Sequence, residues 1–353
     1  MTIDLISDLN EIKEDLKSKK LVLIVTSPGN FKRKYTNEIM ALSKSTNFEI
    51  VTVSGYPTVK NILDIVYKIR NKNFDLILSL GGGSPIDISK VLSVIISNQD
   101  NFALGSVDDF RFINSRITTS KIYHISIPTT SGSGAESTKF STIWDYEKKI
   151  KLSVENPQML PDKVYLYTKF LGSLNFENTL YPGLDAICHS FDSLFNKNKN
   201  DKSEIYALES LEIFKSSFKD LLEDPKNLNL RGKIHQASNL AGKSINITKT
   251  SITHALSYPL TLNYNVPHGL ACAVFIIPII KIYKKELNNI LKDIDLSDII
   301  KLIKDIELET RLLKYTKVID PKIYLQQDLN SRMKNFVEKV NYDDVNKILK
   351  LVI

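Results

Sequence analysis

The chain of 353 residues is 42% apolar and carries a formal net charge of +7. This length allows two domains that each bury a core, and the composition is typical of a globular protein. The lysines are scattered and are not interleaved with aromatic residues, which argues against a nucleic-acid partner. The positive charge remains compatible with anionic small molecules as ligands.

The sequence has no feature of a membrane protein or of a disulfide scaffold. No apolar run reaches the roughly 18 to 20 residues that cross a bilayer. The first residues lack the charged and apolar regions of a signal peptide. Cys188 and Cys272 alone give no disulfide framework. We therefore expect a cytoplasmic protein with no membrane partner.

The first half of the chain alternates short apolar runs with helical patterns. The runs cover residues 21–26, 48–53, 76–80 and 122–127. They are mostly rich in β-branched residues, as buried parallel strands are. Such alternation predicts an α/β layer domain, which we expect at residues 1–163.

From about residue 166 the apolar pattern becomes helical. The longest patterns cover residues 203–222 and 231–244, and a polar connection covers residues 196–202. We expect a second domain at residues 164–353 that is nearly all helix. Within it, Pro259 should break or bend a helix.

Two loops that follow predicted strands are rich in glycine and hydroxyl side chains. Gly-Gly-Gly-Ser-Pro-Ile-Asp at residues 81–87 lies between a strand and a helix, where glycines and a helix N-terminus can cradle a pyrophosphate. Pro-Thr-Thr-Ser-Gly-Ser-Gly at residues 128–134 also follows a strand. Glycine turns also occur without a ligand, but two such loops favour a nucleotide.

A carboxylate and three imidazoles form a candidate metal site. Asp185 and His189 are four residues apart and share a helical face, and His254 and His268 follow downstream. Three nitrogens and one oxygen suit Fe(II), Zn(II) or another first-row ion. The alternative is that each histidine is a satisfied core or surface residue. Cys188 points away from its neighbour His189 on a helix, so we expect it to pack.

Four motifs occur in an order that resembles the iron-containing (group III) alcohol dehydrogenases. They are the two loops at residues 81 and 128, Gly-Leu-Asp-Ala-x-x-His at residue 183 and Pro-His-Gly at residue 267, and the resemblance extends from about residue 21 to about residue 278. It implies an α/β nucleotide-binding domain, an all-α metal domain of the dehydroquinate-synthase-like fold, and an active site between them. It also implies hydride transfer between NADP or NAD and an alcohol or aldehyde, in a homodimer.

The resemblance assigns roles to individual residues. The metal ligands would be Asp185, His189, His254 and His268, and the metal would polarise the carbonyl oxygen. The residues assigned to the cofactor are Gly82, Gly83, Ser84, Asp87, Thr129, Thr130, Ser133 and Lys151. Lys151, which the family has near the nicotinamide ribose, could equally be an ordinary surface lysine.

Two departures from the family pattern affect the mechanism. Tyr258 stands where many members carry a histidine assigned to proton relay, so it is either the catalytic proton donor or a packing residue. Ser27 stands where NAD-preferring members carry an aspartate. Without that carboxylate, Lys32 and Arg33 could attract the 2′-phosphate of NADP(H), unless both are only solvated helix residues.

A finer resemblance, to the phosphonoacetaldehyde reductase branch, covers residues 246–250 and 253–261, and in that branch a tyrosine at position 258 is usual. It predicts an anion site of Lys249, Thr250 and Thr253. The alternative for Lys249 is a helix-end lysine in solvent.

The predicted reaction is reduction of phosphonoacetaldehyde to 2-hydroxyethylphosphonate. Dihydroxyacetone or its phosphate is an alternative substrate. A dehydroquinate-synthase-like cyclisation is an alternative of another class, against which the motifs at residues 128 and 267 count.

Overall fold

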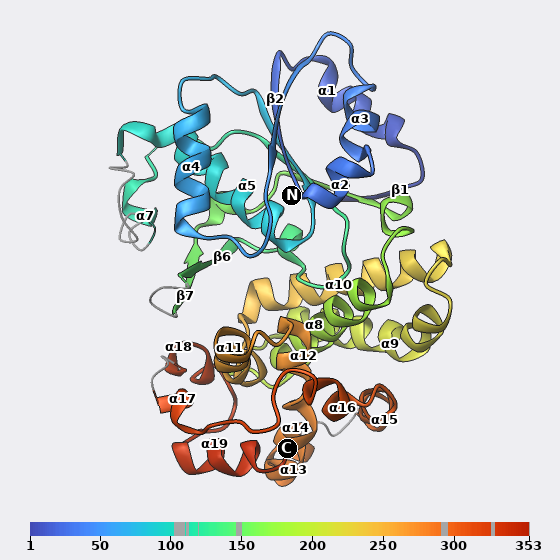
Figure 1. Cartoon of the computed structure of the whole chain (residues 1–353), viewed down its shortest axis with the longest axis vertical. Coiled ribbons are helices and arrows are strands. Elements are labelled where there is room, and N and C mark those ends of the chain that lie inside the picture. Colours follow the sequence, from blue (N-terminus) through green and yellow to red (C-terminus); the bar gives the residue numbers. More distant parts are fainter. Residues whose placement is uncertain are drawn as a thin grey trace. The chain divides into compact units, whose positions relative to one another are not determined.

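The computed structural model describes residues 1–101, 110, 113–118, 120–145, 150–290, 296–325 and 329–352. The chain divides into two compact units, Met1–Thr130 with Gly134–Ser173, and Ser131–Ser133 with Leu174–Ile353 (Figure 1). The expected boundary at residues 163/164 falls at the start of strand β8 (Lys163–Tyr167), which belongs to the first unit. Among the described residues, no helix has both the length and the hydropathy to span a bilayer.

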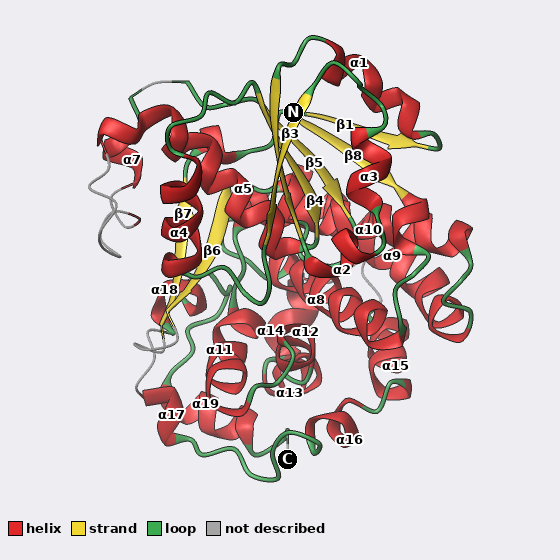
Figure 2. Ribbon diagram, turned by 45° about the horizontal axis from the view of Figure 1, so that its top comes forward, coloured by secondary structure: helices red, strands yellow, loops and turns green. Residues whose placement is uncertain are grey.

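The first unit contains a six-stranded parallel sheet in the order β1-β8-β5-β4-β2-β3 (Figure 2). The other strands are β1 (Thr2–Ile6), β2 (Leu21–Thr26), β3 (Asn47–Thr52), β4 (Leu76–Gly81) and β5 (His124–Pro128). The α/β prediction is confirmed. The four predicted apolar runs are β2, β3, β4 and β5, with ends displaced by up to two residues.

Helices cover both faces of this sheet because neighbouring residues of a strand point to opposite faces. In β2, Leu23 and Val25 pack in one cluster with residues of α4 and α5, whereas Val22 and Ile24 pack in another with residues of α1 and α3. The α-helices among the described residues of this unit are α1 (Lys13–Lys17), α2 (Pro28–Lys32), α3 (Tyr35–Met40), α4 (Val59–Ile69), α5 (Gly83–Ile95) and α7 (Ile113–Arg116). The continuous burial of β4 explains why its sequence is apolar without alternation.

The strand order changes direction at β2, since β3 lies on one side of it and β4 on the other. At such a point the loops at the carboxyl ends of parallel strands diverge and leave room for a ligand. The two loops identified in the sequence follow β4 and β5, which are adjacent strands.

An antiparallel hairpin, β6 (Phe140–Asp145) and β7 (Ile150–Glu155), forms a second, two-stranded sheet that the sequence did not predict. Its Trp144 is buried and forms an isolated bridge with Thr58, the cap of α4. The 3-10 helices of the first unit are η1 (Leu9–Ile12), η2 (Ile96–Asn101), η3 (Ala135–Ser137), η4 (Pro157–Met159) and η5 (Thr168–Leu171).

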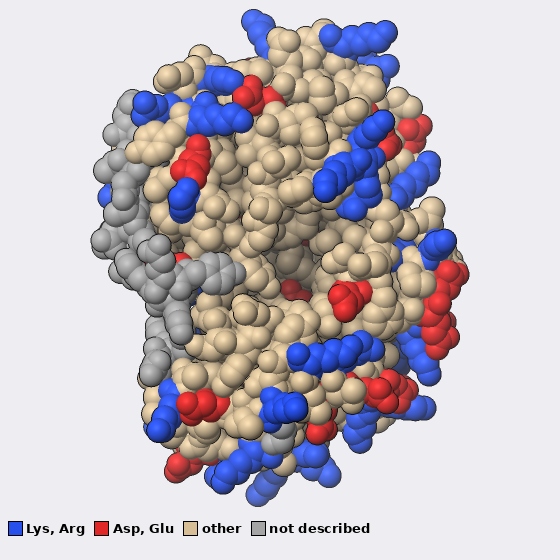
Figure 3. Space-filling model, in the orientation of Figure 1, with Lys and Arg blue, Asp and Glu red and all other residues tan. Residues whose placement is uncertain are grey.

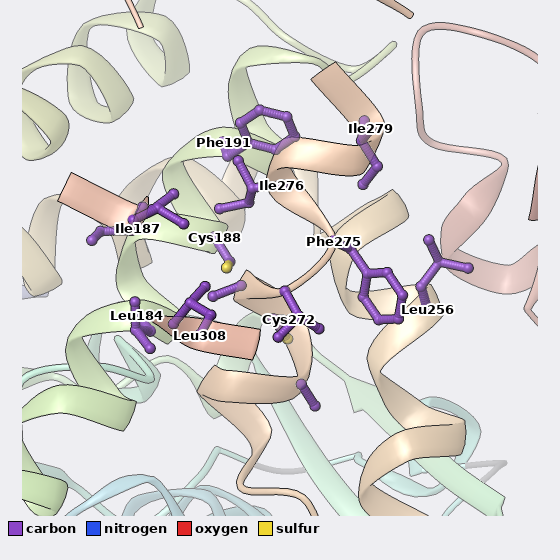
Figure 4. Packing of buried hydrophobic residues seen from close by; sticks show 14 of the residues in the cluster. Leu184, Ile187, Cys188, Phe191, Leu256, Cys272, Phe275, Ile276, Ile279 and Leu308 are labelled. Carbon is purple, nitrogen blue, oxygen red and sulfur yellow. The ribbon is translucent and has the colours of Figure 1, made fainter. Parts of the chain in front are cut away.

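The described part of the second unit is helical, as predicted. Its long helices are α8 (Phe176–Leu194), α9 (Asp201–Glu223), α10 (Leu228–Thr248) and α11 (Ile252–Tyr264). The shorter ones are α12 (His268–Ala273), α13 (Ile276–Ile282), α14 (Lys284–Ile290), α15 (Ser297–Asp305), α16 (Leu308–Leu312), α17 (Lys322–Leu325), α18 (Asn330–Met333) and α19 (Tyr342–Leu349). One hydrophobic cluster runs through them, and Figure 4 shows part of it, including Phe191, Phe275 and both cysteines.

Pro259 does not break the helix, because α11 continues through it to Tyr264, and the alternative expectation of a bend stays a prediction. The helix ends instead at Asn265, whose left-handed backbone (φ 55°) forms a C-terminal cap, and Pro267 follows. Pro182 likewise lies inside α8.

Charged side chains are dispersed over the face drawn in Figure 3, where acidic side chains are interspersed among lysines and arginines. The dispersion agrees with the scattered lysines of the sequence.

Candidate functional site

Four side chains of the second unit converge on one point. Asp185 and His189 lie on α8, His254 lies on α11, and His268 is the first residue of α12. The Nε2 atoms of the three histidines are 3.7, 3.4 and 3.8 Å from Asp185 Oδ1, respectively. The rings of His189 and His254 are stacked, with centroids 4.7 Å apart. The structure therefore brings together all four predicted ligands.

This arrangement fits a metal ion. In a tetrahedral shell with bonds of roughly 2.1 Å, neighbouring donors are about 3.4 Å apart. The three nitrogen–oxygen distances are close to that value. Asp185 Oδ1 and His254 Nε2 are buried atoms without a hydrogen-bond partner, which is costly for polar groups unless something else binds them.

A glycine allows α12 to approach α8. A Cβ atom on Gly269 would lie 1.8 Å from the carbonyl oxygen of Tyr181 and 3.0 Å from the backbone nitrogen of Asp185. A side chain there would force the two helices apart. Gly269 therefore sets the distance between His268 and the carboxylate of Asp185.

A second carboxylate, Asp192 on α8, holds the start of α11. Its fully buried side chain accepts hydrogen bonds from the backbone nitrogens of Ser251 (2.7 Å), Thr253 (3.1 Å) and His254 (3.4 Å). It also lies 2.8 Å from His254 Nδ1. A proton on Nδ1 leaves the Nε2 lone pair directed at Asp185, which is the arrangement of a metal-binding histidine with a carboxylate behind it.

The electrostatics of the cluster follow from its burial and its charges. Burial raises the pKa of Asp185, but His189, His268 and His254 lower it more strongly, so the pKa lies well below its usual range. Burial lowers the pKa of His254, but Cys272, Asp185 and Asp192 more than offset this and raise it well above the usual value. The cluster is therefore built around a negative oxygen.

Cys272 was not among the predicted site residues. One ligand atom from each of Asp185, His254, His268 and Cys272 can be chosen so that all lie within 4.8 Å of one another. The signal that could have revealed Cys272 is its position four residues after His268, one helical turn along α12. Cys188 is fully buried in the hydrophobic cluster, as expected of a packing residue.

The predicted substrate residues lie around the start of α11, and the predicted catalytic residue Tyr258 lies in the middle of that helix. Tyr258 is 7% exposed, and its ring is stacked with that of His268 at 6.3 Å between centroids. Thr253 is fully buried, with Oγ1 3.2 Å from His254 Nδ1, and Thr250 is 6% exposed. Lys249 is partly exposed, and its backbone has φ 64° and ψ 172°. The hydroxyl of Thr253 contacts the predicted metal ligand His254, and the anion site stays a prediction.

The two cofactor loops of the first unit are joined at the ends of β4 and β5. The backbone nitrogen of Thr129 donates to the carbonyl of Gly81 at 2.9 Å. A Cβ atom on Gly82 would lie 2.9 Å from Thr130 Oγ1, so a side chain at this position would require Thr130 to shift. Gly83 and Ser84 form the first turn of α5, whose N-terminal N–H groups can bind an anion.

A buried asparagine, Asn30 in α2, was missed by the sequence analysis. Its side chain donates to the carbonyl of Leu80 and to Thr129 Oγ1, both at 3.0 Å. It therefore joins the segment after β2 to the end of β4 and to the segment after β5.

Asp87 and Lys151 of the first unit have structural partners. Asp87 receives an ion pair from Lys90 at 2.9 Å and a hydrogen bond from the backbone nitrogen of Thr142 at 2.9 Å. Burial lowers the pKa of Lys90, which Asp87 opposes. The ammonium of Lys151 lies over the Trp144 ring, 5.4 Å from its centroid. Their cofactor roles remain predictions.

The short segment Ser131–Ser133 groups with the second unit. Ser131 Oγ is 3.1 Å from His235 Nδ1 on α10, and a Cβ atom on Gly132 would lie 2.4 Å from Pro182 Cβ on α8. Ser133, the predicted cofactor residue of this segment, is partly exposed.

The end of β2 carries the residues that bear on cofactor preference. Ser27 caps α2 by accepting a hydrogen bond from the backbone nitrogen of Asn30 at 3.2 Å. The guanidinium of Arg33 donates to Asn30 Oδ1 at 2.9 Å and lies over the Tyr35 ring at 5.3 Å. Lys32 is exposed.

Comparison with known proteins covers almost the whole chain. Residues 4–168 match the description of iron-containing alcohol dehydrogenases, and residues 179–350 match the C-terminal part of the Fe-containing alcohol dehydrogenase family. A solved iron-containing alcohol dehydrogenase from Thermotoga maritima is 25% identical, with a TM-score of 0.81 over 100% of this chain and 97% of that one.

Three curated relatives are similar at this level. An NADPH-dependent butanol dehydrogenase of Clostridium saccharobutylicum is 25% identical over 92% of this chain and 80% of its own length. A sulfoacetaldehyde reductase of Bilophila wadsworthia is 29% identical over 81% and 73%. A phosphonoacetaldehyde reductase of Streptomyces viridochromogenes is 24% identical over 73% and 66%. This chain belongs to the iron-containing alcohol dehydrogenase family and is an NAD(P)-dependent, metal-containing oxidoreductase.

Proposed function

We propose that the protein reduces a small anionic aldehyde, such as phosphonoacetaldehyde, to the corresponding alcohol with NADPH. The observation that carries this proposal is the backbone of Lys249. A residue with φ 64° and ψ 172° lies in a region almost reserved for glycine, at a cost of about 1 to 3 kcal/mol. Such a conformation persists only where the surrounding structure holds it in place, and strained residues cluster at functional sites.

The neighbourhood of Lys249 supports an anion-binding role. The residue connects α10 to α11, the helix that carries His254. Its carbonyl accepts a hydrogen bond from Asn196 at 3.1 Å, and its nitrogen donates to Ile245 at 2.8 Å, so the strained backbone is held from both sides. An ammonium and the hydroxyl of Thr250 would bind a dianionic head group, with Thr253 behind them against His254.

Two of the curated relatives support the same substrate class. Their names specify phosphonoacetaldehyde and sulfoacetaldehyde, which are two-carbon aldehydes with an anionic head group. The butanol dehydrogenase relative favours a neutral alcohol or aldehyde as the second candidate.

We assign the remaining roles to the residues of the candidate site. Asp185, His189, His254 and His268 hold a divalent metal, Fe(II) or Zn(II), and Tyr258 supplies the proton for the alcohol product. The cofactor is held by the residues already assigned to it: Gly82, Gly83, Ser84, Asp87, Thr129, Thr130, Ser133 and Lys151. When bound, the metal supplies Lewis-acid polarisation and the nicotinamide supplies hydride.

The preference for NADPH rests on the end of β2. Ser27 has no negative charge to repel a 2′-phosphate, and its hydroxyl is used as a helix cap. Arg33 is oriented by Asn30 and Tyr35 at the same end of the strand, so its guanidinium is available as a bidentate donor to phosphate.

The test measures NADPH and NADH oxidation by metal-loaded protein with phosphonoacetaldehyde, sulfoacetaldehyde, dihydroxyacetone and acetaldehyde. We expect the highest kcat/KM with an anionic aldehyde and NADPH. If only the neutral carbonyl compounds are turned over, the protein is still a dehydrogenase, but the proposed anion site is excluded. No net consumption of either nicotinamide would favour a lyase.

The variant Lys249→Met distinguishes a loss of anion binding from a general loss of activity. Loss of a charge-assisted hydrogen bond should raise KM for the anionic aldehyde about 10- to 100-fold and leave acetaldehyde nearly unchanged. Lys233→Met, which removes an exposed lysine of α10, is the matched control. If Lys249→Met affects both aldehydes equally, Lys249 does not bind the anionic head group.

A further inference from the structure

A fully buried lysine, Lys90 in α5, has no role in the function proposed above. Its side chain is 0% exposed, although lysine is almost never completely buried unless it is paired. The ammonium donates to Asp87 Oδ1 at 2.9 Å, to Thr138 Oγ1 at 2.9 Å and to the carbonyl of Phe140 at 2.6 Å. Three acceptors match the three N–H groups of an ammonium. Burial lowers the pKa of Lys90, which Asp87 and Glu136 oppose.

The acceptors of Lys90 connect the two cofactor loops within the first unit. Asp87 is the last residue of the loop motif at residues 81–87. Thr138 caps η3, the 3-10 helix that directly follows the loop at residues 128–134, and its hydroxyl donates to the carbonyl of Ala135 at 3.2 Å. Phe140 is the first residue of β6. Lys90 therefore joins the helix that starts at the first loop to the chain that leaves the second.

The carboxylate of Asp87 is held at both oxygens. Oδ1 pairs with Lys90, and Oδ2 accepts from the backbone nitrogen of Thr142 at 2.9 Å. Ser84, Asp87 and Lys90 follow one another at three-residue spacing on α5, so they lie along one face of the helix. An unpaired carboxylate one turn after Ser84 would repel a pyrophosphate bound at the N-terminus of this helix. The ammonium of Lys90 offsets that charge.

We propose that Lys90 is a positioning residue of the cofactor site, which neutralises Asp87 and fixes its carboxylate beside the glycine loop. Asp87 can then accept a hydrogen bond from the cofactor without repelling its pyrophosphate. Because Lys90 is fully buried, it acts through Asp87. This inference rests on the assignment of Asp87 and the glycine loop to the cofactor. It concerns NADPH and NADH equally, since both carry the pyrophosphate.

Removal of the Lys90 charge tests this role by cofactor binding alone. We expect Lys90→Met to raise the Kd of NADPH and that of NADH alike, by about 10- to 100-fold. The Kd values are measured by nucleotide fluorescence on metal-loaded protein without aldehyde. The double variant Lys90→Met/Asp87→Asn carries neither charge, so both Kd values should return to within about threefold of those of Asp87→Asn alone. Lost packing would not be repaired by the second substitution, so this recovery reports the charge.

Lys121→Met is the matched control. Lys121 is a partly buried lysine of the same unit that pairs with Asp162 at 3.0 Å. The two residues precede the amino ends of β5 and β8, whereas the cofactor loops follow the carboxyl ends of β4 and β5. Lys121→Met should therefore leave both Kd values unchanged. If Lys90→Met does not fold, Lys90→Gln replaces it with the same expectation, because glutamine keeps an N–H donor but loses the charge.

Two results would overturn the proposal. One is a Lys90→Met protein that binds both nucleotides as tightly as the wild type does, and the other is a double variant that binds them no better than Lys90→Met. A wild type that binds neither nucleotide would refute the cofactor assignment, and this inference with it. The measurements contain no aldehyde, so a failure of the anionic-aldehyde proposal leaves them unaffected.

Discussion

The hydrogen bonds of Asp192 lead to a quantitative prediction for Asp192→Asn. One carboxylate oxygen accepts from Ser251 and His254 Nδ1, and the other accepts from the backbone nitrogen of Thr253. Asparagine keeps one acceptor and replaces the other with an NH2 group. If the oxygen facing His254 is kept, the NH2 group meets the N–H of Thr253, and a buried charge-assisted bond is lost.

The expected cost has two separate parts. A hydrogen bond to a charged group contributes about 1.5 to 3 kcal/mol, so the free energy of unfolding should fall by roughly that amount. His254 also loses the carboxylate that fixes its tautomer, and loss of such a partner typically weakens metal affinity about 10- to 100-fold. The assays are urea unfolding of metal-free protein and a competitive Zn(II) titration.

Arg231→Met provides the matched control. Arg231 is buried on α10 and donates to the Pro225 and Leu174 carbonyls and to Thr179 Oγ1, away from the predicted ligands. Because three hydrogen bonds are removed, it should lower the free energy of unfolding at least as much as Asp192→Asn does, and it should leave metal affinity unchanged. If Asp192→Asn binds Zn(II) as tightly as the wild type does, the proposed role of Asp192 is refuted.

Three further predictions concern other buried positions. The pKa of His124 lies well below its usual value because the residue is fully buried. The unfolded state therefore binds the proton more readily than the folded state does. As the pH is lowered from about 6.5, the free energy of unfolding should decrease by up to about 1.4 kcal/mol per pH unit. Urea unfolding from pH 5 to 7.5 should show a shallower slope for His124→Gln than for the wild type. Gly269→Ala places a methyl group against the Tyr181 carbonyl, so thermal unfolding and Zn(II) titration should show losses of about 1 to 3 kcal/mol in stability together with weakened metal binding. Lys249→Gly should raise the free energy of unfolding by about 1 kcal/mol by relieving the positive φ, and an unchanged or lower melting temperature would contradict the strain argument.

Much of the fold could be predicted from the sequence because short apolar runs and helical patterns are local features of the chain. The strands β2, β4 and β5 are buried on both faces and therefore read as short apolar runs. β1 lies at the edge of the sheet and has one buried residue, Ile6, so its sequence carries no such run. The hairpin of β6 and β7 depends on pairing with a neighbour, which a single segment does not reveal.

The candidate site could be predicted where its residues recur at helical spacing. Asp185 and His189 share a face of α8, and Asp192 lies on the same face one turn further. The sequence analysis used the first two and missed the third, because a buried carboxylate that binds backbone N–H groups has no signature of its own. The contact between Gly269 and Tyr181 could not be predicted either, since it depends on how two distant helices meet.

The anchoring of α11 by Asp192 has a consequence for how the protein acquires its ion. The backbone nitrogens at the start of this helix are bound by a protein side chain, and the crossing of α8 and α12 is set by a glycine. Neither contact includes a metal. We therefore expect the protein itself to position the donors, so that a metal ion can bind after the chain has folded. The ion carried in the cell would then follow the supply of first-row metals as well as the chemistry of the ligands.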